Sequence, residues 1–490
     1  MHNGAFFTTR LGLILTGIGM AVGTGNLWRF PRVAAQNGGG AFLFAWMTCL
    51  FLWSLPLLIA EFSVGRHTRR APIGAFAALL GTKSAWMGGF VALTSIMIMF
   101  YYSVVTGWTL KYAISSGFGD LSGIDHLIFW ADYTASIWWP IAFHVICICL
   151  AGYVVSRGVV NGIEPINRLL MPLLFGLLLL SVFRSLTLPG AADGVLFLFT
   201  FEWQSLLDHQ LWLEALTQSA WSTGAGWGLM LTYASYVRND EDVIVSSTLI
   251  GLANNAVSLL AALAIIPAMF SILPTNQVYE AMNSGNVGLT FVWIPQLYEN
   301  MPGGTTFLTV FFITLFVAAL SSLIAMVEMS SRVLSDMNMR RTQAVVVVVG
   351  VTVVFGIPSA ISLQIFENQD WVWGLGLLIS GLLIASLTVK GGLDQFRSNK
   401  TQQGVFDKPL AAFYSSALKY FVPVAFLSMF AWWMYQSANY YDPSQWWNPI
   451  RVNSVGTCLL QWAIAGIVLR LVGRELGAKS YARNVTLDSS

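Results

Sequence analysis

The residues best suited to chemistry stand at an interruption in the first apolar segment of the chain. Residues 11–22 are apolar enough to enter a bilayer, and Gly23, Thr24, Gly25 and Asn26 follow directly. Glycine costs about 1 kcal/mol relative to alanine in a helix interior, so this run predicts a broken helix. Such a break is tolerated in hydrocarbon only where it is buried in protein or lines a wet cavity. Its freed carbonyls can bind a cation and its freed amides an anion. The alternative is a glycine hinge at a close helix crossing.

A second apolar segment repeats the anomaly. Residues 216–235 contain Gly224, Gly226 and Gly228 within five positions. Paired interrupted segments at corresponding places of two halves are typical of transporters with inverted repeats and a midplane binding site. The pattern therefore predicts a binding site between the two broken helices.

The composition indicates a polytopic membrane protein embedded in a lipid bilayer. Of 490 residues, 56% are hydrophobic and only 10% are charged, whereas soluble proteins carry roughly 25% charged residues. The net charge of +2 suggests no nucleic-acid partner. The four cysteines lie in apolar runs without zinc-like spacing, and the five histidines are scattered. Because no nucleophile stands beside a base, an intramembrane enzyme is disfavoured.

The predicted fold is all-α, with twelve transmembrane helices of about 20 residues or more. The predicted spans are 10–36, 41–66, 86–115, 137–156, 165–184, 211–237, 243–272, 305–335, 343–361, 371–390, 412–436 and 452–473. The broken spans are the first and the sixth. Because five is odd, the second half must insert inverted relative to the first. We thus expect a 5+5 inverted repeat, residues 1–184 and 185–390, followed by residues 391–490 with two further spans and a tail.

The distribution of Lys and Arg predicts the orientation in a plasma or inner membrane. The loops at 116–136, 185–210, 273–304 and 362–370 contain no Lys or Arg, and the alternate loops carry most of the basic residues. Basic loops stay on the cytoplasmic side. Both termini are therefore expected to be cytoplasmic.

Four motifs together resemble the neurotransmitter:sodium symporter family. They are the glycine-asparagine run 23–31, the run Asn37 to Phe42, the sequence Thr232 to Tyr236, and Leu320-Ser321-Ser322. The resemblance extends from Arg10 to about Val389. It implies a sodium-coupled symporter of the bacterial amino-acid type that works by alternating access.

Carried onto this sequence, the resemblance implies two sodium sites, one substrate pocket and two gates. The first sodium site comprises Ala21, Asn26, Ser222 and Asn254 with a substrate carboxylate, and the second comprises Gly19, Val22, Ala318, Ser321 and Ser322. The substrate pocket comprises Ala21, Thr24, Gly25, Ile98, Tyr102, Trp221, Ser222, Gly224, Trp227, Ser322 and Met326. The outer gate pairs Arg29 with Asp370, and the inner gate includes Tyr236 and Asp336.

Gly23 indicates the class of substrate. Family members that carry monoamines have Asp at this position, so here the substrate is expected to supply the carboxylate. The aromatic and apolar pocket favours a neutral, hydrophobic L-amino acid. Two alternatives stay open: a symporter for another small carboxylate-bearing osmolyte, and an amino-acid sensor with little flux.

Two departures from the family pattern leave further questions open. The family's chloride ligands correspond to Trp46, Gln218, Ser222, Asn254 and Ser258, with Trp46 in place of a tyrosine. Three ways of balancing the sodium charge stay open. Chloride can be bound by these residues, a carboxylate such as Glu61 or Glu328 can supply the negative charge, or a proton can be exported in exchange. The inner-gate arginine of the family is replaced by Gly4. The oligomeric state, monomer or homodimer, is also left open.

Overall fold

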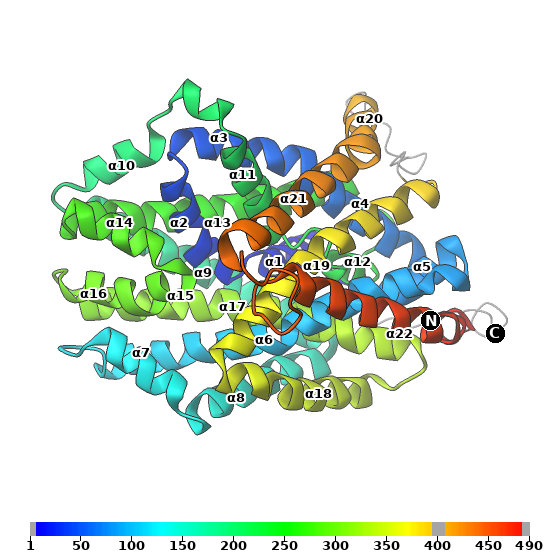
Figure 1. Ribbon diagram of the computed structural model, residues 1–490. Coiled ribbons are helices and arrows are strands. Elements are labelled where there is room, and N and C mark those ends of the chain that lie inside the picture. Colours follow the sequence, from blue (N-terminus) through cyan, green and yellow to red (C-terminus); the bar gives the residue numbers. More distant parts are fainter. Residues whose placement is uncertain (1–5, 394–406, 483–490) are drawn as a thin grey trace.

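The computed structural model describes residues 6–393 and 407–482, and every regular element in this part of the chain is a helix (Figure 1). Ten helical segments are long and apolar enough to cross a membrane, and one bent pair raises the number to eleven. The remaining predicted span, 211–237, is divided between α11 (His209–Ser222) and α12 (Leu229–Ala234). The all-α membrane fold is confirmed, while the count of twelve spans stays a prediction.

The ten long segments correspond to predicted spans. They are Gly40–Thr68 (α3, Gly40–Cys49, to α4, Leu55–Thr68), Thr82–Phe118 (ending in α6, Ala85–Phe118), Trp138–Ser156 (α8), Val159–Leu186 (ending in α9, Glu164–Leu186), Val243–Ile272 (α13), Gly304–Asp336 (α17), Arg341–Ile361 (α18), Leu363–Lys390 (α19), Pro409–Tyr441 (from α20, Asp407–Ser416, through α21, Val422–Gln436) and Val455–Tyr481 (in α22, Val455–Ala482). Shorter helices connect them: α5 (Pro72–Leu80), α7 (His126–Ala135), α10 (Ala191–Phe199), α14 (Thr275–Asn283), α15 (Gly285–Gly288) and α16 (Ile294–Glu299).

The first predicted break is confirmed. The hydroxyl of Thr9 caps helix α1 (Arg10–Ala21) by accepting from the Gly12 N–H. The helix ends where Val22 turns to an extended conformation. The chain resumes in a π-helical turn (Gly25–Arg29) and α2 (Phe30–Gln36), bent by 60° from α1. The interruption therefore leaves the carboxyl end of α1 facing the protein interior.

The second predicted break is confirmed between Ser222 and Leu229. Gly224, Gly226 and Gly228 have φ values of +67°, +89° and +75°, in the left-handed region that glycine enters without a Cβ penalty. The buried carboxylate of Glu61 on α4 accepts from the N–H groups of Gly226 at 2.6 Å and Leu231 at 3.0 Å. Backbone groups freed by the break are thus satisfied by a side chain, as hydrocarbon requires.

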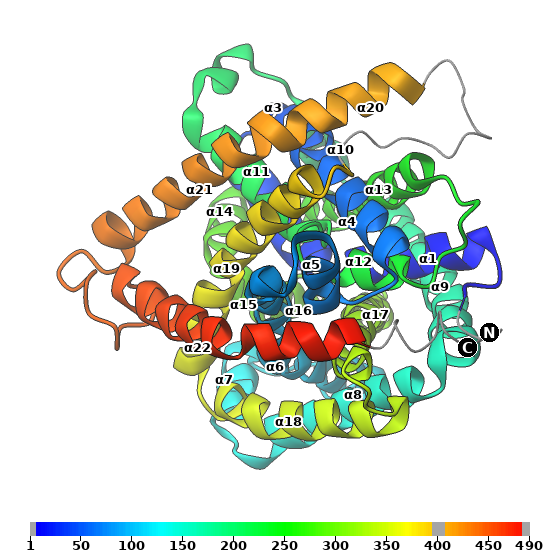
Figure 2. The ribbon, with the colours of Figure 1, turned by 90° about the vertical axis from the view of Figure 1, so that its right-hand side faces the viewer.

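The broken helices lie at the centre of the bundle. Helix α1 packs against α9, α13 and α17, while α12 packs against α4. Helices α18, α21 and α22 lie at the periphery (Figure 2). Exposed leucine and isoleucine side chains such as Leu460, Ile464 and Leu471 cover α22. An apolar exposed surface of this kind suits contact with lipid.

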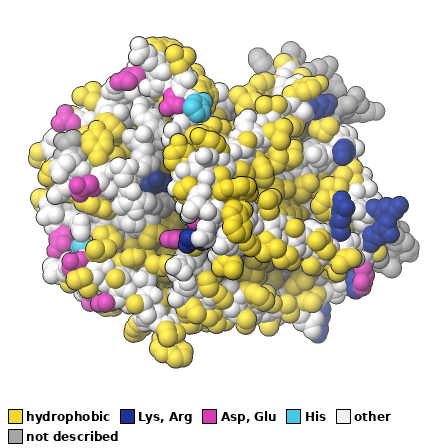
Figure 3. Space-filling view, viewed as in Figure 1, with side chains coloured by type: hydrophobic (Ala, Val, Ile, Leu, Met, Phe, Trp, Pro, Cys, Tyr) yellow, Lys and Arg dark blue, Asp and Glu magenta, His cyan; other side chains and the backbone are white. Residues whose placement is uncertain are grey.

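Charged side chains gather at opposite ends of the molecule. Figure 3 shows Asp and Glu mainly at the left end and Lys and Arg mainly at the right, with apolar side chains between them. The first described residue, Phe6, lies under the Arg69 guanidinium at 5.3 Å, and Arg70 donates to the Tyr481 carbonyl at 3.2 Å. Both ends of the described chain thus lie at the basic end. Gly4 lies outside the described residues.

Candidate functional site

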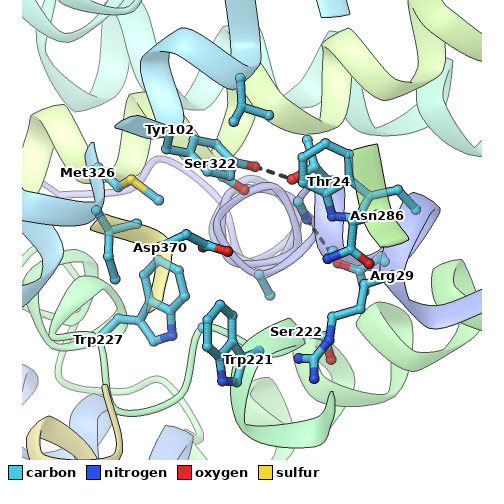
Figure 4. Close-up of a pocket in the computed structure, with 18 of the residues that line it drawn as sticks. Thr24, Arg29, Tyr102, Trp221, Ser222, Trp227, Asn286, Ser322, Met326 and Asp370 are labelled. Atoms are coloured by element: carbon cyan, nitrogen blue, oxygen red, sulfur yellow. Dashed lines mark hydrogen bonds between the residues drawn. The ribbon is translucent and has the colours of Figure 1, made fainter. Parts of the chain in front are cut away.

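A cavity lies between the two broken helices and helices α6, α17 and α19, with an empty volume of about 790 Å³ including its open mouth (Figure 4). All eleven predicted substrate residues line it: Ala21, Thr24, Gly25, Ile98, Tyr102, Trp221, Ser222, Gly224, Trp227, Ser322 and Met326. The structure therefore brings this set together, and its role in substrate binding stays a prediction. The lining residues that sequence reasoning assigned to no site are Met20, Gly23, Trp28, Tyr101, Val105, Asn286 and Phe366.

The cavity wall is mostly aromatic and apolar. Figure 4 shows Trp221, Trp227 and Met326 around it, with the Tyr102 hydroxyl directed toward the break in the first helix. The Tyr102 hydroxyl accepts from the Thr24 N–H at 3.2 Å. Among the described lining residues, Arg29 and Asp370 carry the charges. The cavity therefore suits a molecule with a small polar head and a neutral body.

Three oxygen atoms face one another at the predicted first cation site. The Asn254 Oδ1 atom lies 2.8 Å from the Ser222 carbonyl oxygen and 3.2 Å from that of Ala21. The same Oδ1 accepts from Asn26 Nδ2 at 2.8 Å. Turning the Asn254 amide over would place its NH₂ group 2.8 Å from that of Asn26, which exchanges a contact between acceptors for one between donors. A cation bound among these oxygens would make the present orientation of Asn254 favourable, so its amide would not need to turn over.

Asn26 itself is oriented differently from the prediction. Its Oδ1 atom accepts from the Gly23 N–H at 2.9 Å, and its Nδ2 atom faces Asn254 and the Ser258 hydroxyl. Its amide would have to turn over to offer oxygen to a cation at this place. The other three predicted residues already present oxygens to one another, so the role of Asn26 as an oxygen ligand stays a prediction.

The predicted second cation site lies where the carboxyl end of α1 meets α17. The Ser322 hydroxyl lies 2.9 Å from the Val22 carbonyl oxygen and 3.5 Å from that of Gly19. The adjacent Ser321 hydroxyl donates to the Ala318 carbonyl at 2.9 Å. Carbonyls at a helix carboxyl end carry partial negative charge, and neutral oxygens suit a monovalent cation. The five predicted residues, here called the second cation cluster, thus lie where α1 meets α17, and their role as sodium ligands stays a prediction.

The predicted chloride residues include buried donors without partners. The Trp46 Nε1 atom and both polar side-chain atoms of Gln218 are buried without a hydrogen-bond partner. These residues lie on α3 and α11, which pack together. Ser258 and Asn254 lie beside Asn26, and Asn254 Nδ2 is 3.4 Å from the Ser222 hydroxyl. Because an unpaired buried donor costs about 1–3 kcal/mol, these N–H groups fit an anion.

Both carboxylates considered as alternatives to chloride are engaged elsewhere. Glu61 binds the backbone of the second break. Glu328 accepts from the Tyr236 hydroxyl at 2.5 Å and forms an ion pair with Arg341. Neither contact involves the residues of the first cation site.

The predicted outer gate residues do not form an ion pair in this structure. Arg29 and Asp370 both line the cavity, and they lie apart in Figure 4. Arg29 lies 3.8 Å from Glu214 of α11 and 5.2 Å above the ring of Trp221. Asp370 lies near the Tyr101 side chain instead. Each charged group is therefore held on its own side of the cavity mouth.

The predicted inner gate residues belong to a connected network at the basic end. Asp336 pairs with Arg332 at 3.1 Å and accepts from the Ala71 N–H at 2.7 Å. Arg332 also donates to the Arg69 carbonyl at 2.9 Å, and its guanidinium lies 5.0 Å above the Tyr236 ring. Sequence reasoning missed Arg332 and Arg341. The four-residue spacing of Arg332 and Asp336 on α17 could have indicated that ion pair, whereas the pairing of Arg341 with Glu328 joins two helices and has no signal in local spacing.

A sequence model of the sodium:neurotransmitter symporter family matches residues 5–127 and 131–475. The chain belongs to this family. The uncharacterized sodium-dependent transporter YhdH of Bacillus subtilis (strain 168) is 30% identical over 86% of this chain and 96% of its own length. The sodium-dependent neutral amino acid transporter SLC6A17 of Homo sapiens is 28% identical over 54% of this chain and 40% of its own length.

A solved structure with the same fold is the crystal structure of MhsT in complex with L-phenylalanine. It matches with a TM-score of 0.75 and 28% identity, over 87% of this chain and 99% of that chain. Membership of the sodium:neurotransmitter symporter family is thus established by sequence and by fold. The chain is a multi-pass membrane protein of a transporter family.

Proposed function

We propose that this sodium:neurotransmitter symporter is a sodium-coupled symporter of a neutral, hydrophobic L-amino acid that works by alternating access. The observation that carries the proposal is the cavity. Most of its wall is aromatic and apolar, and its polar end lies at the break of the first helix, beside Gly23. Gly23 brings no carboxylate to the first cation cluster, so an amino acid's own carboxylate completes it. The complex of MhsT with L-phenylalanine supports the same substrate class.

Two sodium ions are the proposed co-substrates. Each ion gains about 2.3 kcal/mol per 100 mV and about 1.4 kcal/mol from a tenfold sodium gradient. Together they supply roughly 7 kcal/mol, enough for about five decades of substrate accumulation. Chloride is the proposed third ion, supported by the unpaired donors of Trp46 and Gln218. Its entry would reduce the electrical part of the driving force by about half.

The contacts at the two ends of the cavity favour an outward-facing arrangement. Tyr236 is bonded to Glu328 at the basic end, while Arg29 and Asp370 form no ion pair across the mouth. In alternating access, binding of sodium and substrate would draw Arg29 and Asp370 together before the inner network parts. The basic end is proposed to face the cytoplasm, with both termini there.

The test is uptake of labelled amino acids by purified protein in liposomes, with and without an inward sodium gradient. We expect sodium-driven accumulation of one or more neutral, hydrophobic amino acids. Accumulation of a different carboxylate-bearing osmolyte would overturn the substrate class. Saturable binding without accumulation would replace the symporter with a sensor.

A further inference from the structure

A buried asparagine of α9 has an oxygen atom without a partner. Asn167 is 1% exposed, and its Nδ2 atom donates to the Ile163 carbonyl at 2.9 Å. Its Oδ1 atom is buried and accepts no hydrogen bond. An amide oxygen withdrawn from water without a partner is costly. Such a cost points to a role in binding, and the surroundings of this atom indicate what it binds.

The unpaired oxygen is aimed at the second cation cluster. A Cβ atom built on Gly19 would lie 2.2 Å from Asn167 Oδ1 and 3.3 Å from the Cβ of Ser321. Asn167 Oδ1 therefore touches the α1 backbone at a residue whose carbonyl belongs to the cluster, on the side that also contacts Ser321. Position 19 has to be glycine because any side chain would displace this oxygen.

A second oxygen without a partner lies on the face of α1 that contacts Asn167. Thr16 is three residues before Gly19, which places the two on neighbouring positions of the helix surface. The Thr16 hydroxyl is buried without a partner. Several other buried threonines of the bundle bond to their own helix, as Thr94 does to the Phe90 carbonyl at 2.9 Å and Thr106 to that of Tyr102 at 2.8 Å. Where α1 packs against α9, two buried oxygens without hydrogen-bond partners, those of Thr16 and Asn167, thus lie next to the second cation cluster.

We propose that Asn167 is a further oxygen ligand of the second sodium ion and sets the affinity and cation preference of that site. The proposal rests on the proposed function, because it needs a sodium ion at this cluster. A neutral amide oxygen matches the hydroxyls and carbonyls already present, and the number of such oxygens governs selectivity among monovalent cations. The residue adds no charge, so the number of ions coupled to each substrate is unaffected.

The test compares Asn167→Leu with the wild type in detergent, without substrate. Sodium, lithium and potassium are titrated separately, and the half-saturating concentration is read from cation-dependent thermal stabilisation. We expect Asn167→Leu to raise the half-saturating sodium concentration about tenfold and to narrow the preference for sodium over potassium. The control is Ser185→Ala on the same helix, whose hydroxyl is also buried and unpaired. Ser185 is 18 positions along α9, about 27 Å away, and its removal should change neither quantity.

A double-mutant cycle separates ligation from a structural effect. The loss in Asn167→Leu should largely disappear in a Ser321→Ala background, where the second site is already damaged, and should add fully to Asn26→Ala at the first site. Additivity with Ser321→Ala would overturn the proposal. Should Asn167→Leu fail to fold, Asn167→Asp serves instead: its carboxylate should lower the half-saturating sodium concentration at least threefold, and no change would overturn the proposal.

The wild type keeps the two levels of inference apart. If it shows sodium-driven uptake while Asn167→Leu retains the wild-type sodium titration, this inference fails and the proposed function stands. If the wild type shows neither sodium-dependent stabilisation nor uptake, the proposed function fails and the inference fails with it.

Discussion

The side-chain amide of Asn26 donates to Asn254 at 2.8 Å and to Ser258 at 2.8 Å. It thereby joins the break of the first helix to α13 at the point where the proposed first cation site meets the proposed chloride site. A single neutral amide between a cation and an anion can respond to both. The geometry gives a physical reason for sodium and chloride to bind together rather than independently.

Asn26→Ala is expected to abolish sodium-driven uptake while leaving folded protein. The substitution removes the hydrogen bonds that Nδ2 donates to Asn254 and Ser258 and the one that Oδ1 accepts from the Gly23 N–H. It also leaves Asn254 Oδ1 facing two carbonyl oxygens, and each buried polar group left unpaired costs about 1–3 kcal/mol. Liposome uptake measures the first effect, and elution as a single peak in size-exclusion chromatography checks the second. Retained sodium-driven uptake would contradict the first-site assignment.

Uptake is expected to fall severalfold when gluconate replaces chloride. Ser258→Glu should make uptake independent of chloride, because a fixed carboxylate would supply the negative charge beside Asn26. Ser247→Ala, on the same helix and with an unpaired buried hydroxyl, is the control that should keep chloride dependence. Equal wild-type uptake in both media would refute the chloride site. Glu61 and Glu328 would then again be the candidates for balancing the sodium charge.

Gly23→Ala is expected to weaken substrate binding at least tenfold. A Cβ atom at Gly23 would lie 2.8 Å from the Tyr102 hydroxyl and 3.2 Å from that of Ser322. Both hydroxyls line the proposed substrate pocket, and both would have to shift. At Gly25 a Cβ atom would meet nothing within 4 Å. Gly25→Ala is therefore the matched control: it should fold normally and disfavour only the bulkiest substrates. Competition binding with a series of amino acids of increasing size distinguishes the two, and equal affinities in Gly23→Ala and wild type would contradict the pocket geometry.

The broken helices could be predicted from sequence because hydrocarbon leaves few alternatives for glycine runs within apolar segments. The cavity lining was predicted from the resemblance to the symporter family, since residues such as Ile98 on α6 and Met326 on α17 lie on unbroken helices and carry no such signal in their own spacing. The partners of the charged residues could not be predicted. Arg29 lies near Glu214 rather than Asp370, and Asn286 reaches the cavity from a short loop helix. Such contacts depend on how distant helices pack in one conformation, which local spacing does not encode.

Tyr236→Phe is expected to open the inner end of the cavity. The change removes the 2.5 Å bond to Glu328, and a hydrogen bond to a charged acceptor contributes about 2 kcal/mol, which corresponds to roughly a thirtyfold shift between conformations. The readout is labelling of a cysteine introduced at Ile98, which lines the cavity, by a membrane-impermeant thiol reagent applied from each side of oriented vesicles. The exposed Cys149 is first replaced by serine.

Tyr233→Phe is the control for this experiment, because Tyr233 lies three residues earlier, on α12, and its hydroxyl is buried and has no partner. Removing it breaks no bond, so labelling should match the wild type. In Tyr236→Phe, labelling from the basic end should accelerate and labelling from the acidic end should slow. Unchanged labelling from both sides would mean that the Arg332–Asp336 pair and its contacts to Arg69 and Ala71 close the inner end without Tyr236.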